Sequence, residues 1–419
     1  MVVTVFGLGF VGLTTAVAFA DKGIKVYGIE VNEERRSTIA KGELPFYEPG
    51  LGEALERTLD KTFFVDVPVS EAVHESDCVY YCVGTPYGEN GQADLTYLFG
   101  AIDETLPALD PNKFTVLVVK STVPPSTTDE LVRAHIEEQG YKIGENIGIA
   151  NNPEFLREGH CWEDVIDADR IVLGVSDEKS SAVLRDLYKD FDCPVHTVTL
   201  NTGEYIKYLS NTLLATLISW SNEMSLIANT VGDIQIAEAF RVLHEDKRWG
   251  VPACNMATYA YPGCGYGGYC LPKDTNALYA RSKAKGYEPK MLRETIAVND
   301  AMPAAIASLV EDACGNDTAK RIGFCGLSFK PGSDDVRDTP AAKIMAKLID
   351  DGYTCVSGYD PLAIEEFDRW YDLDVVFADS LEKLVEDADV LVIATAWPEF
   401  LEVPKLAGNK PIVDARYML

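Results

Sequence analysis

Short apolar runs alternate with helical patterns through the first 200 residues. The runs at 2–6 and 25–29 are β-type and enclose a helical pattern. Further apolar runs at 77–83 and 114–120 each end in turn residues, as parallel strands do where a ligand lies at their carboxyl ends. This alternation predicts a doubly wound α/β domain over residues 1–200.

A long helical pattern follows from residue 203 to about residue 229, without proline or glycine after Gly203. At ~1.5 Å per residue such a helix spans about 40 Å, enough to bridge two domains. Further helical patterns extend to residue 309 and flank the glycine-rich segment YPGCGYGGYCLPKD. We therefore predict a central helical domain over residues 201–309.

The alternation of strands and helices restarts at Arg321 with RIGFCGLSF, a helical pattern at 341–350 and YTCVSGYDP. The later segment SLEKLVEDADVLVIATAW repeats the order of elements seen in SEAVHESDCVYYCVGTP of the first domain. A second α/β domain is predicted over 310–419. It has no GxGxxG motif, so we do not expect it to bind a second dinucleotide in the same way.

The motif GLGFVG lies between the first predicted strand and the first helix. Gly7 would make the tight turn, Gly9 would let the backbone approach a pyrophosphate, and Gly12 would pack the helix on the strand. The positive end of the helix would stabilise the phosphate charge. A plain tight turn in a sheet without a ligand is the competing interpretation.

Glu30 follows the second strand, 18 residues after Gly12. An acidic side chain there hydrogen-bonds the adenosine ribose hydroxyls and repels a 2′-phosphate, so NAD is favoured over NADP. Arg35 and Arg36 follow closely and could instead receive a phosphate.

Cys270 is the best candidate for a catalytic thiol. Lys273 and Asp274 follow it, and a nearby cation favours the nucleophilic thiolate. Three glycines before it predict a loop that a substrate can approach closely: Gly265, Gly267 and Gly268. A packed cysteine beside a turn is the alternative, and Cys264 is a second candidate thiol.

Lys207 and Asn211 are spaced i, i+4 in EYIKYLSN, so both lie on one face of the long helix. An amine and an amide on an otherwise apolar face can polarise an oxygen together. The plainer alternative is a lysine that reaches solvent and an asparagine at a polar boundary.

The segment FKPGSDDVRDTP places Lys330 and Arg337 before a predicted helix, where two cations suit a phosphate group. The competing interpretation is a solvated salt-bridge network with the neighbouring acidic residues, Asp334, Asp335 and Asp338.

Composition narrows the class of protein. The 419 residues include 37 Lys and Arg against 66 Asp and Glu, a formal net charge of −29, which argues against a nucleic-acid or anionic-membrane partner. The ten cysteines show no CxxC and no metal-like spacing, so we expect free thiols, no metal site and a cytoplasmic location. Neither a signal peptide nor a membrane span is expected. Because the cations occur in the ligand motifs, the acidity is expected on the outer surface.

Seven motifs occur together: GLGFVG, YEPGL, STVP, NPEFLREG, KYLSN, GYGGYCLPKD and FKPGSDDVRDTP. In this order and spacing they resemble the UDP-glucose/GDP-mannose dehydrogenases, and the resemblance covers essentially the whole chain. It implies two Rossmann-like doubly wound domains joined by a long central helix and a helical dimerisation region.

The resemblance also implies an NAD-dependent four-electron oxidation of a sugar C6 alcohol to a carboxylate. By analogy, Cys270 forms a thiohemiacetal that is oxidised to a thioester and hydrolysed. Lys207 and Asn211 would stabilise oxyanions, and Asp274 would order the catalytic water. Glu154, with Thr122, would help to activate water for thioester hydrolysis.

Contacts to the ligands are likewise implied by the resemblance. The cofactor contacts are Gly7, Gly9, Phe10, Val11, Gly12, Glu30, Arg35, Thr85, Thr122, Glu158 and Arg337. The sugar-nucleotide contacts are Phe155, Leu156, Lys207, Asn211, Arg248, Gly267 and Lys330.

Arg248 matches an arginine that reaches the sugar of a neighbouring subunit, which implies a homodimer and favours UDP-glucose. Trp249 stands where the family usually has Ile, and Glu30 where it usually has Asp. UDP-N-acetylmannosamine, UDP-N-acetylglucosamine and GDP-mannose remain alternative substrates. A non-catalytic sensor of NAD and nucleotide sugars, and a two-electron dehydrogenase that stops at the aldehyde, remain alternative functions.

Overall fold

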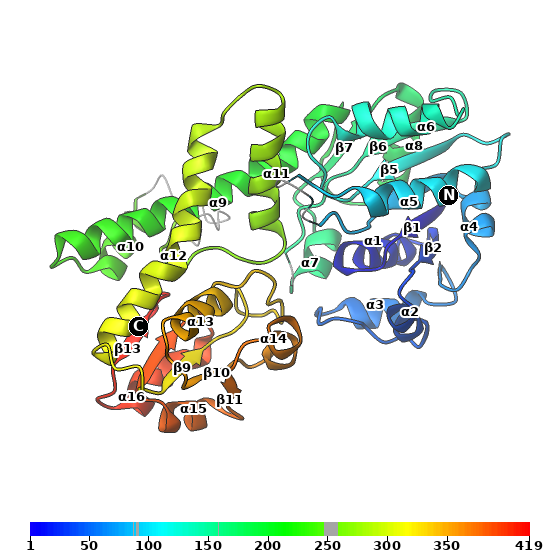
Figure 1. The fold of residues 1–419 in the computed structure, drawn as a ribbon. Coiled ribbons are helices and arrows are strands. Elements are labelled where there is room, and N and C mark those ends of the chain that lie inside the picture. The colour runs from blue at the N-terminus through cyan, green and yellow to red at the C-terminus, as the bar shows by residue number, and fades with distance from the viewer. Residues whose placement is uncertain (87, 89–91, 158, 247–258) are drawn as a thin grey trace. The chain divides into compact units, whose positions relative to one another are not determined.

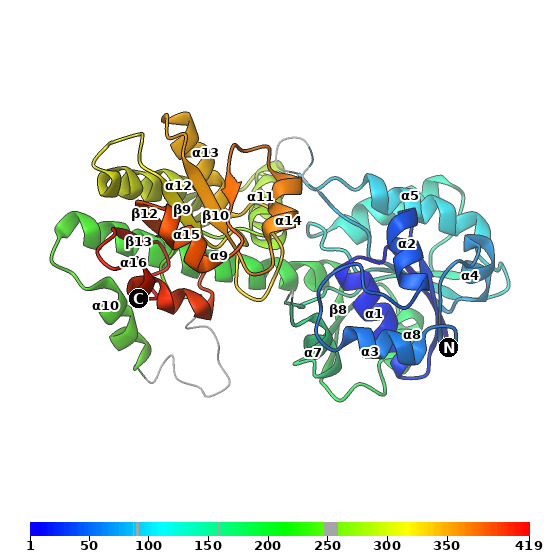
Figure 2. The same ribbon diagram turned by 90° about the horizontal axis from the view of Figure 1, so that it is seen from below.

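The computed structural model describes the chain except for residues 87, 89–91, 158 and 247–258. It divides into two compact units, Met1–Leu209 and Ser210–Leu419. Figures 1 and 2 label the helices and strands of each unit. Since this division falls at a different place from the predicted three-domain boundaries, those boundaries stay a prediction.

The first unit is built on an eight-stranded sheet in the order β3-β2-β1-β4-β5-β6-β7-β8. Neighbouring strands are parallel except for the antiparallel pair β6 and β7. The strands are β1 (Val2–Phe6), β2 (Lys25–Ile29), β3 (Phe63–Phe64), β4 (Cys78–Tyr81), β5 (Thr115–Val119), β6 (Ile147–Asn151), β7 (Ile171–Val175) and β8 (Val195–Thr199). The predicted doubly wound α/β fold is confirmed, with a mixed rather than wholly parallel sheet.

Strand residues of this sheet alternate between two apolar clusters, because successive side chains point to opposite faces. Val3 and Val5 belong to one cluster, with α1 (Phe10–Asp21), α3 (Leu51–Thr58) and α8 (Glu178–Leu187). Val79 and Tyr81 belong to the other, with α4 (Val69–Glu75) and α5 (Thr96–Thr105). Helix α1 packs beside α3 and α7 (Figure 2). The helices are α1 (Phe10–Asp21), α2 (Glu33–Ala40), α3 (Leu51–Thr58), α4 (Val69–Glu75), α5 (Thr96–Thr105), α6 (Arg133–Glu138), α7 (Cys161–Ile166) and α8 (Glu178–Leu187).

The second unit contains a five-stranded parallel sheet in the order β11-β10-β9-β12-β13. Its strands are β9 (Ile322–Cys325), β10 (Val356–Tyr359), β11 (Val376–Phe377), β12 (Val390–Ile393) and β13 (Ile412–Asp414). The helices are α10 (Ile236–His244), α11 (Cys270–Ala284), α12 (Lys290–Cys314), α13 (Pro340–Asp350), α14 (Ile364–Trp370), α15 (Leu381–Asp387) and α16 (Val403–Ala407). This confirms the second predicted α/β sheet.

Helix α9 (Leu200–Val231) is the predicted long helix, and the division between the units falls within it. It begins before Gly203 rather than at it. A Cβ atom on Gly203 would lie 2.2 Å from Asn151 Oδ1, so only glycine lets the helix approach the end of β6 this closely. In the described part of the chain, no helix is long and apolar enough to cross a membrane.

Candidate active site

The three glycines of GLGFVG have three different surroundings. Gly7 has φ +84°, and a Cβ there would lie 2.9 Å from the Cys82 carbonyl oxygen. A Cβ on Gly12 would lie 1.8 Å from the Gly7 carbonyl oxygen, so Gly12 lets α1 pack on the turn. A Cβ on Gly9 would have no heavy atom of the described structure within 4 Å. The protein itself does not require a glycine there, which fits a backbone that a pyrophosphate approaches at the start of α1.

Glu30 is buried at the end of β2 and lies against the same turn. Its carboxylate accepts hydrogen bonds from Leu8 N at 3.0 Å and from Asn32 N at 2.8 Å. Arg35 forms an ion pair with it at 3.2 Å, and Arg36 is paired with Asp66 at 2.8 Å. Both arginines are therefore engaged by carboxylates, which weakens the alternative that they receive a 2′-phosphate.

Two of the predicted cofactor contacts meet at the ends of neighbouring strands. Thr85, after β4, donates its hydroxyl hydrogen to the Thr122 carbonyl at 2.9 Å, after β5. Ser121 in turn donates to the Val83 carbonyl at 2.6 Å. The carboxyl ends of β4 and β5 thus form one connected edge, where a doubly wound sheet binds its ligand.

Glu154 and Lys207 form a buried ion pair with a separation of 2.9 Å. Burial opposes ionisation of Glu154, but the attraction and hydrogen bond of Lys207 outweigh it, so the pKa of Glu154 is lowered. Leu156 N donates to the other Glu154 oxygen at 2.7 Å, and the Phe155 ring lies 5.7 Å from the Lys207 amine. Because Lys207 is buried, the alternative in which it reaches solvent is wrong.

Lys120 is a second buried amine near this pair, and sequence reasoning did not single it out. Its Nζ donates to Asn152 Oδ1 at 3.0 Å, and the Tyr188 hydroxyl donates to the same oxygen at 2.5 Å. Burial lowers the pKa of Lys120, while Glu154 opposes that change. A lysine directly before the STVP motif was the available signal, but its burial depends on contacts distant in sequence.

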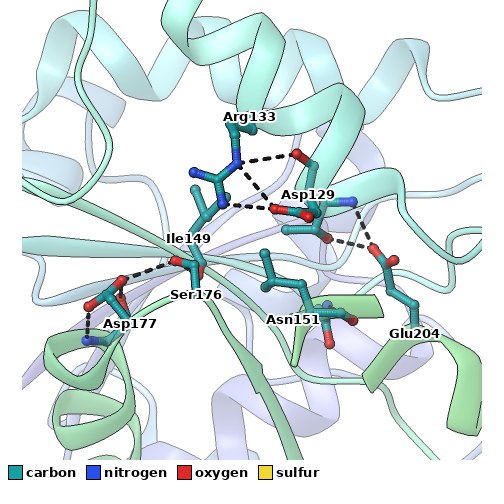
Figure 3. Close-up of polar contacts among 10 residues, drawn as sticks. Asp129, Arg133, Ile149, Asn151, Ser176, Asp177 and Glu204 are labelled. Atoms are coloured by element: carbon teal, nitrogen blue, oxygen red, sulfur yellow. Dashed lines mark hydrogen bonds and ion pairs between the residues drawn. The ribbon is translucent and has the colours of Figure 1, made fainter. Parts of the chain in front are cut away.

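Glu204 is a further buried carboxyl that the sequence analysis missed. It reaches from α9 towards the segment that carries Asp129 (Figure 3). Its Oε1 accepts hydrogen bonds from Thr128 N at 2.8 Å and from the Thr128 hydroxyl at 2.7 Å. Burial raises the pKa of Glu204 to about 7, although the Thr128 hydrogen bonds oppose the rise.

In the second unit, Asp274 connects Asn211 with Lys273. Asn211 Nδ2 donates to one of its oxygens at 2.6 Å, and Lys273 Nζ donates to the other at 2.6 Å. Burial disfavours the charge of Lys273, but Asp274 outweighs this effect and raises the pKa of Lys273, with a further contribution from Cys270. The three polar side chains are buried, so they form a fixed acceptor and donor set.

Cys270 is the first residue of α11 and is half-buried. The start of a helix carries partial positive charge, which favours a thiolate. Cys264, by contrast, is buried in the apolar core and its Sγ donates to the Ala394 carbonyl at 3.4 Å. Cys264 is therefore a structural residue, and none of the nine cysteines in the described chain forms a disulfide.

The glycines before Cys270 pack against the FKPGSDDVRDTP segment. A Cβ on Gly267 would lie 2.4 Å from the Asp338 carbonyl oxygen, and one on Gly268 would lie 3.0 Å from the Phe329 ring. Gly268 N also donates to the Arg337 carbonyl at 2.8 Å. Gly267 and Gly268 thus allow the loop before Cys270 to contact the FKPGSDDVRDTP loop. The sequence analysis had instead explained these glycines by the close approach of a substrate.

The two cations of that segment have different surroundings. Arg337 binds both oxygens of the buried Asp335 at 2.8 Å and stacks over Tyr269, so it forms one salt bridge of the alternative interpretation. Lys330 is half-buried, with its amine 5.4 Å from the Phe329 ring. Two further predicted residues, Glu158 and Arg248, lie outside the described residues.

Family models match the chain in three consecutive parts. Residues 1–192 match the NAD binding domain of the UDP-glucose/GDP-mannose dehydrogenase family, residues 201–301 its central domain and residues 323–419 its UDP binding domain.

Individual relatives match over nearly the whole length. A UDP-glucose 6-dehydrogenase of Haloferax volcanii is 34% identical over 96% of this chain and 92% of its own. The structure of a UDP-glucose dehydrogenase from Pyrobaculum islandicum matches with a TM-score of 0.91 and 35% identity, covering 99% of this chain and 94% of that one. A UDP-D-ManNAc dehydrogenase from Pyrococcus horikoshii matches with a TM-score of 0.87 and 29% identity, covering 100% and 96%.

Proposed function

Because the chain belongs to the UDP-glucose/GDP-mannose dehydrogenase family, we propose that it oxidises the C6 alcohol of UDP-glucose to the carboxylate of UDP-glucuronate. The observation that carries the substrate is the full-length similarity to relatives named UDP-glucose 6-dehydrogenase. We place the reaction in the cytoplasm, where the Cys270 thiol stays reduced.

The glycine turn and Glu30 are the residues that would hold NAD in the first unit. Gly9 leaves the backbone open to the pyrophosphate, and the start of α1 stabilises its charge. Glu30 is preset by Leu8 N and Asn32 N to face the ribose hydroxyls. Phe10, Val11, Arg35, Thr85, Thr122, Glu158 and Arg337 are the further proposed contacts. When bound, NAD accepts one hydride in each of two successive oxidations.

Cys270 supplies the nucleophile between the two oxidations. Its thiolate adds to the C6 aldehyde, and the carbonyl oxygen takes up a proton to give a thiohemiacetal that again carries a C–H bond at C6. Loss of hydride and of the hydroxyl proton gives a thioester. Water then adds to the thioester carbonyl, the C–S bond breaks, and the carboxylate leaves with Cys270 restored.

Polar side chains are assigned to the oxygens and water of this sequence. Lys207 and Asn211 stabilise the developing oxyanions, because a fixed cation and amide donor favour negative charge in a dry site. Asp274 orders the attacking water, and Glu154 with Thr122 helps to activate it. The carboxylates of Glu154 and Asp274 are held in place by buried partners, and this fixed placement supports the two roles. Phe155, Leu156, Gly267, Lys330 and Arg248 complete the proposed sugar-nucleotide contacts.

We also propose a homodimer in which Arg248 reaches the neighbouring active site. The support is an apolar stripe on α9 whose side chains are 40–70% exposed: Tyr205, Leu209, Leu213, Trp220, Ile227 and Val231. At 3.6 residues per turn these positions fall within an arc of about 80°. A second copy of the chain would bury them, so Ile227→Glu should shift the protein to a monomer in sedimentation, unlike the surface change Lys405→Glu.

The stoichiometry of NADH release tests the reaction. Purified protein with excess NAD should release two NADH per UDP-glucose, and a panel with UDP-N-acetylmannosamine, UDP-N-acetylglucosamine and GDP-mannose tests the sugar. Turnover of an acetamido sugar without turnover of UDP-glucose would overturn the substrate, and one NADH per sugar would overturn the four-electron reaction.

The thiol is tested by Cys270→Ser, with the exposed Cys355→Ser as the matched control. Steady-state turnover should fall at least ~1000-fold in the first variant, because a hydroxyl is a far weaker nucleophile at neutral pH, and should be unchanged in the second. Equal turnover of the Cys270 variant and the wild type would exclude the covalent route.

A further inference from the structure

A small cavity in the first unit joins Glu204 to residues of the candidate active site. It is lined by four residues between Val119 and Val123, by Asn151 and Pro153, and by Glu204 and Lys207. The volume open to the centre of a water molecule is about 10 Å³. That is about the space one buried water needs.

One oxygen of Glu204 is available to such a water. The Oε1 atom is taken by the two hydrogen bonds from Thr128. The Oε2 atom is fully buried and forms no hydrogen bond of normal geometry with a described group, although the Ser126 and Thr127 main-chain N–H groups also favour the Glu204 charge. The whole residue is only 3% exposed. A buried carboxylate oxygen without a donor costs free energy, so a water that donates to it is strongly favoured.

Lys207 lies one helical turn after Glu204 on α9 and lines the same cavity. Its amine has three hydrogens, one of which is directed to Glu154 at 2.9 Å. Lys120 also acts electrostatically on Glu154 and Lys207. Glu204 and Lys207 therefore contribute an acceptor group and a donor group to the lining of a space of one water's size.

We propose that this cavity binds one water molecule, which accepts a hydrogen bond from Lys207 Nζ and donates one to Glu204 Oε2. Through this water Glu204 is a positioning residue for Lys207: it fixes the direction of the amine and supports its positive charge. The inference rests on the proposed function for the role of Lys207, but the water site itself does not depend on the substrate.

The consequence for catalysis follows from the charge of Glu204. The pKa of Glu204 is raised to about 7, so above neutral pH the carboxylate is negative and favours the protonated Lys207. An oxyanion-stabilising lysine works only while it is protonated. Removing the Glu204 charge should therefore lower the pH at which activity is lost on the alkaline side.

Structure determination tests the water directly. A crystal structure of the wild-type protein at high resolution should show one ordered water within hydrogen-bond distance of both Glu204 Oε2 and Lys207 Nζ. A cavity without ordered water, or a water bound only to Asn151, would overturn the site. This result is independent of turnover, so it stands apart from any failure of UDP-glucose as substrate.

Two matched variants test the positioning role. Glu204→Gln keeps an acceptor for Thr128 but removes the charge, whereas Thr128→Val removes the hydroxyl but keeps the charge. In kcat/KM profiles with the nucleotide sugar that the panel identifies, Glu204→Gln should shift the alkaline limb to lower pH by about 0.5–1 unit. Thr128→Val and the exposed Glu138→Gln should leave it in place.

A merely structural role gives a different pattern. Equal changes in Glu204→Gln and Thr128→Val, or a Glu204→Gln profile that coincides with the wild type, would overturn the positioning role. As a readout that needs no turnover, infrared difference spectra between pH 6 and pH 8 should contain the band of a neutral buried carboxyl in the wild type. The band should be absent in Glu204→Gln, and its presence there would assign it to another group and count against Glu204.

Discussion

The two α/β units have corresponding central strands and a corresponding glycine turn after the first of them. The turns differ in whether the space beside the main chain is open or filled by the protein's own side chains. Strand order β3-β2-β1-β4-β5 in the first unit corresponds to β11-β10-β9-β12-β13 in the second. Gly7 N donates to the Ile29 carbonyl at 2.8 Å, and Gly326 N donates to the Tyr359 carbonyl at 2.8 Å. Both glycines have positive φ and precede a fully buried leucine.

The difference begins two residues after each turn glycine. In the first unit this position is Gly9, which is open, and α1 starts at the next residue. In the second it is Ser328, whose hydroxyl is bonded to Asp360 and to the Lys330 carbonyl. Its helix, α13, starts only at Pro340. The first unit therefore presents a helix start beside its turn, whereas the second places a loop there.

The acidic residue after the second strand of each sheet, Glu30 after β2 and Asp360 after β10, also differs in its hydrogen bonds. Glu30 accepts two main-chain N–H groups and the Arg35 guanidinium. Asp360 accepts four main-chain N–H groups as well as the Ser328 hydroxyl and the Trp397 indole. Asp360 thus uses its carboxylate to hold the loop of its own unit. Glu30 accepts fewer hydrogen bonds from the protein, so its carboxylate can accept further ones from a ligand.

The largest expected effect is the loss of Asp360. Asp360→Ala leaves four main-chain donors without a partner and should lower the free energy of unfolding by about 3–5 kcal/mol. Glu30→Ala, which leaves two, should cost about 1–2 kcal/mol. Urea unfolding of both variants measures the difference, with Asp360→Asn expected between Asp360→Ala and the wild type. Equal losses would break the comparison.

The second effect is a pH dependence of stability that is larger in the first unit than in the second. Folded Glu204 has a pKa of about 7 against an unfolded value of about 4.3, so the folded state holds an extra proton between these values. Its stability contribution is complete below about pH 4.3 and is lost as the pH rises through 7. The free energy of unfolding of the wild type should therefore decline between pH 5 and pH 8, and Glu204→Gln should make this decline smaller by about 1–3 kcal/mol.

Hydrogen exchange resolved by segment measures this decline in each unit. In the second unit, burial also raises the pKa of Asp300, Asp334 and Glu399, but Asp300 and Glu399 are exposed and Asp334 is only half-buried. The decline should therefore be smaller there. A Glu204→Gln variant with the same decline as the wild type would contradict the assignment.

The third effect separates ligand affinity from stability. Gly9→Ser places a side chain in open space, so the thermal unfolding temperature should change little, but the Kd for NAD should rise at least ~10-fold, or about 1.4 kcal/mol. The reciprocal change Ser328→Gly should lower stability through its lost hydrogen bonds and should not create NAD affinity. Calorimetry measures both, and unchanged NAD affinity in Gly9→Ser would remove the support for a pyrophosphate at this turn.

The smallest effect concerns an aspartate that occupies corresponding positions before β4 and β12. Asp77 accepts from Val2 N at 2.8 Å and pairs with Lys113, and Asp389 accepts from Arg321 N at 3.0 Å and pairs with that guanidinium. These pairs are partly exposed, so Asp77→Asn and Asp389→Asn should each cost less than about 1 kcal/mol. Similar small losses in urea unfolding would support the correspondence, and a large loss in only one would break it.

The sequence predicted the elements that depend on local pattern. The runs at 2–6 and 25–29 became β1 and β2 within the same bounds, because alternating apolar residues and glycine turns act over a few positions. The equivalence of Gly326 with Gly7 was hidden, since no second GxGxxG follows it. It became visible only through the main-chain hydrogen bonds of the two turns.

The candidate site was predicted less evenly. Cys270 was chosen from motif chemistry, whereas Lys207 and Asp274 received their roles from the resemblance to the family, and all three roles stay predictions. Lys120 and Glu204 could not, because their partners Asn152 and Thr128 are 32 and 76 residues away in sequence. A lone lysine or glutamate in a sequence is normally solvated, and only the tertiary structure shows that these two are not.

Helix α9 also has an evolutionary consequence. Asn151 Nδ2 donates to the Leu200 carbonyl at 2.8 Å, and Gly203 packs on the same side chain, so the first turns of this helix are completed by the sheet that precedes them. A recombination event between relatives that joined one ancestor's first 199 residues to another's remainder would separate Asn151 from both Leu200 and Gly203. Exchange at a breakpoint after Lys207 would keep them together, and inherited mosaics of this family should carry their crossovers there.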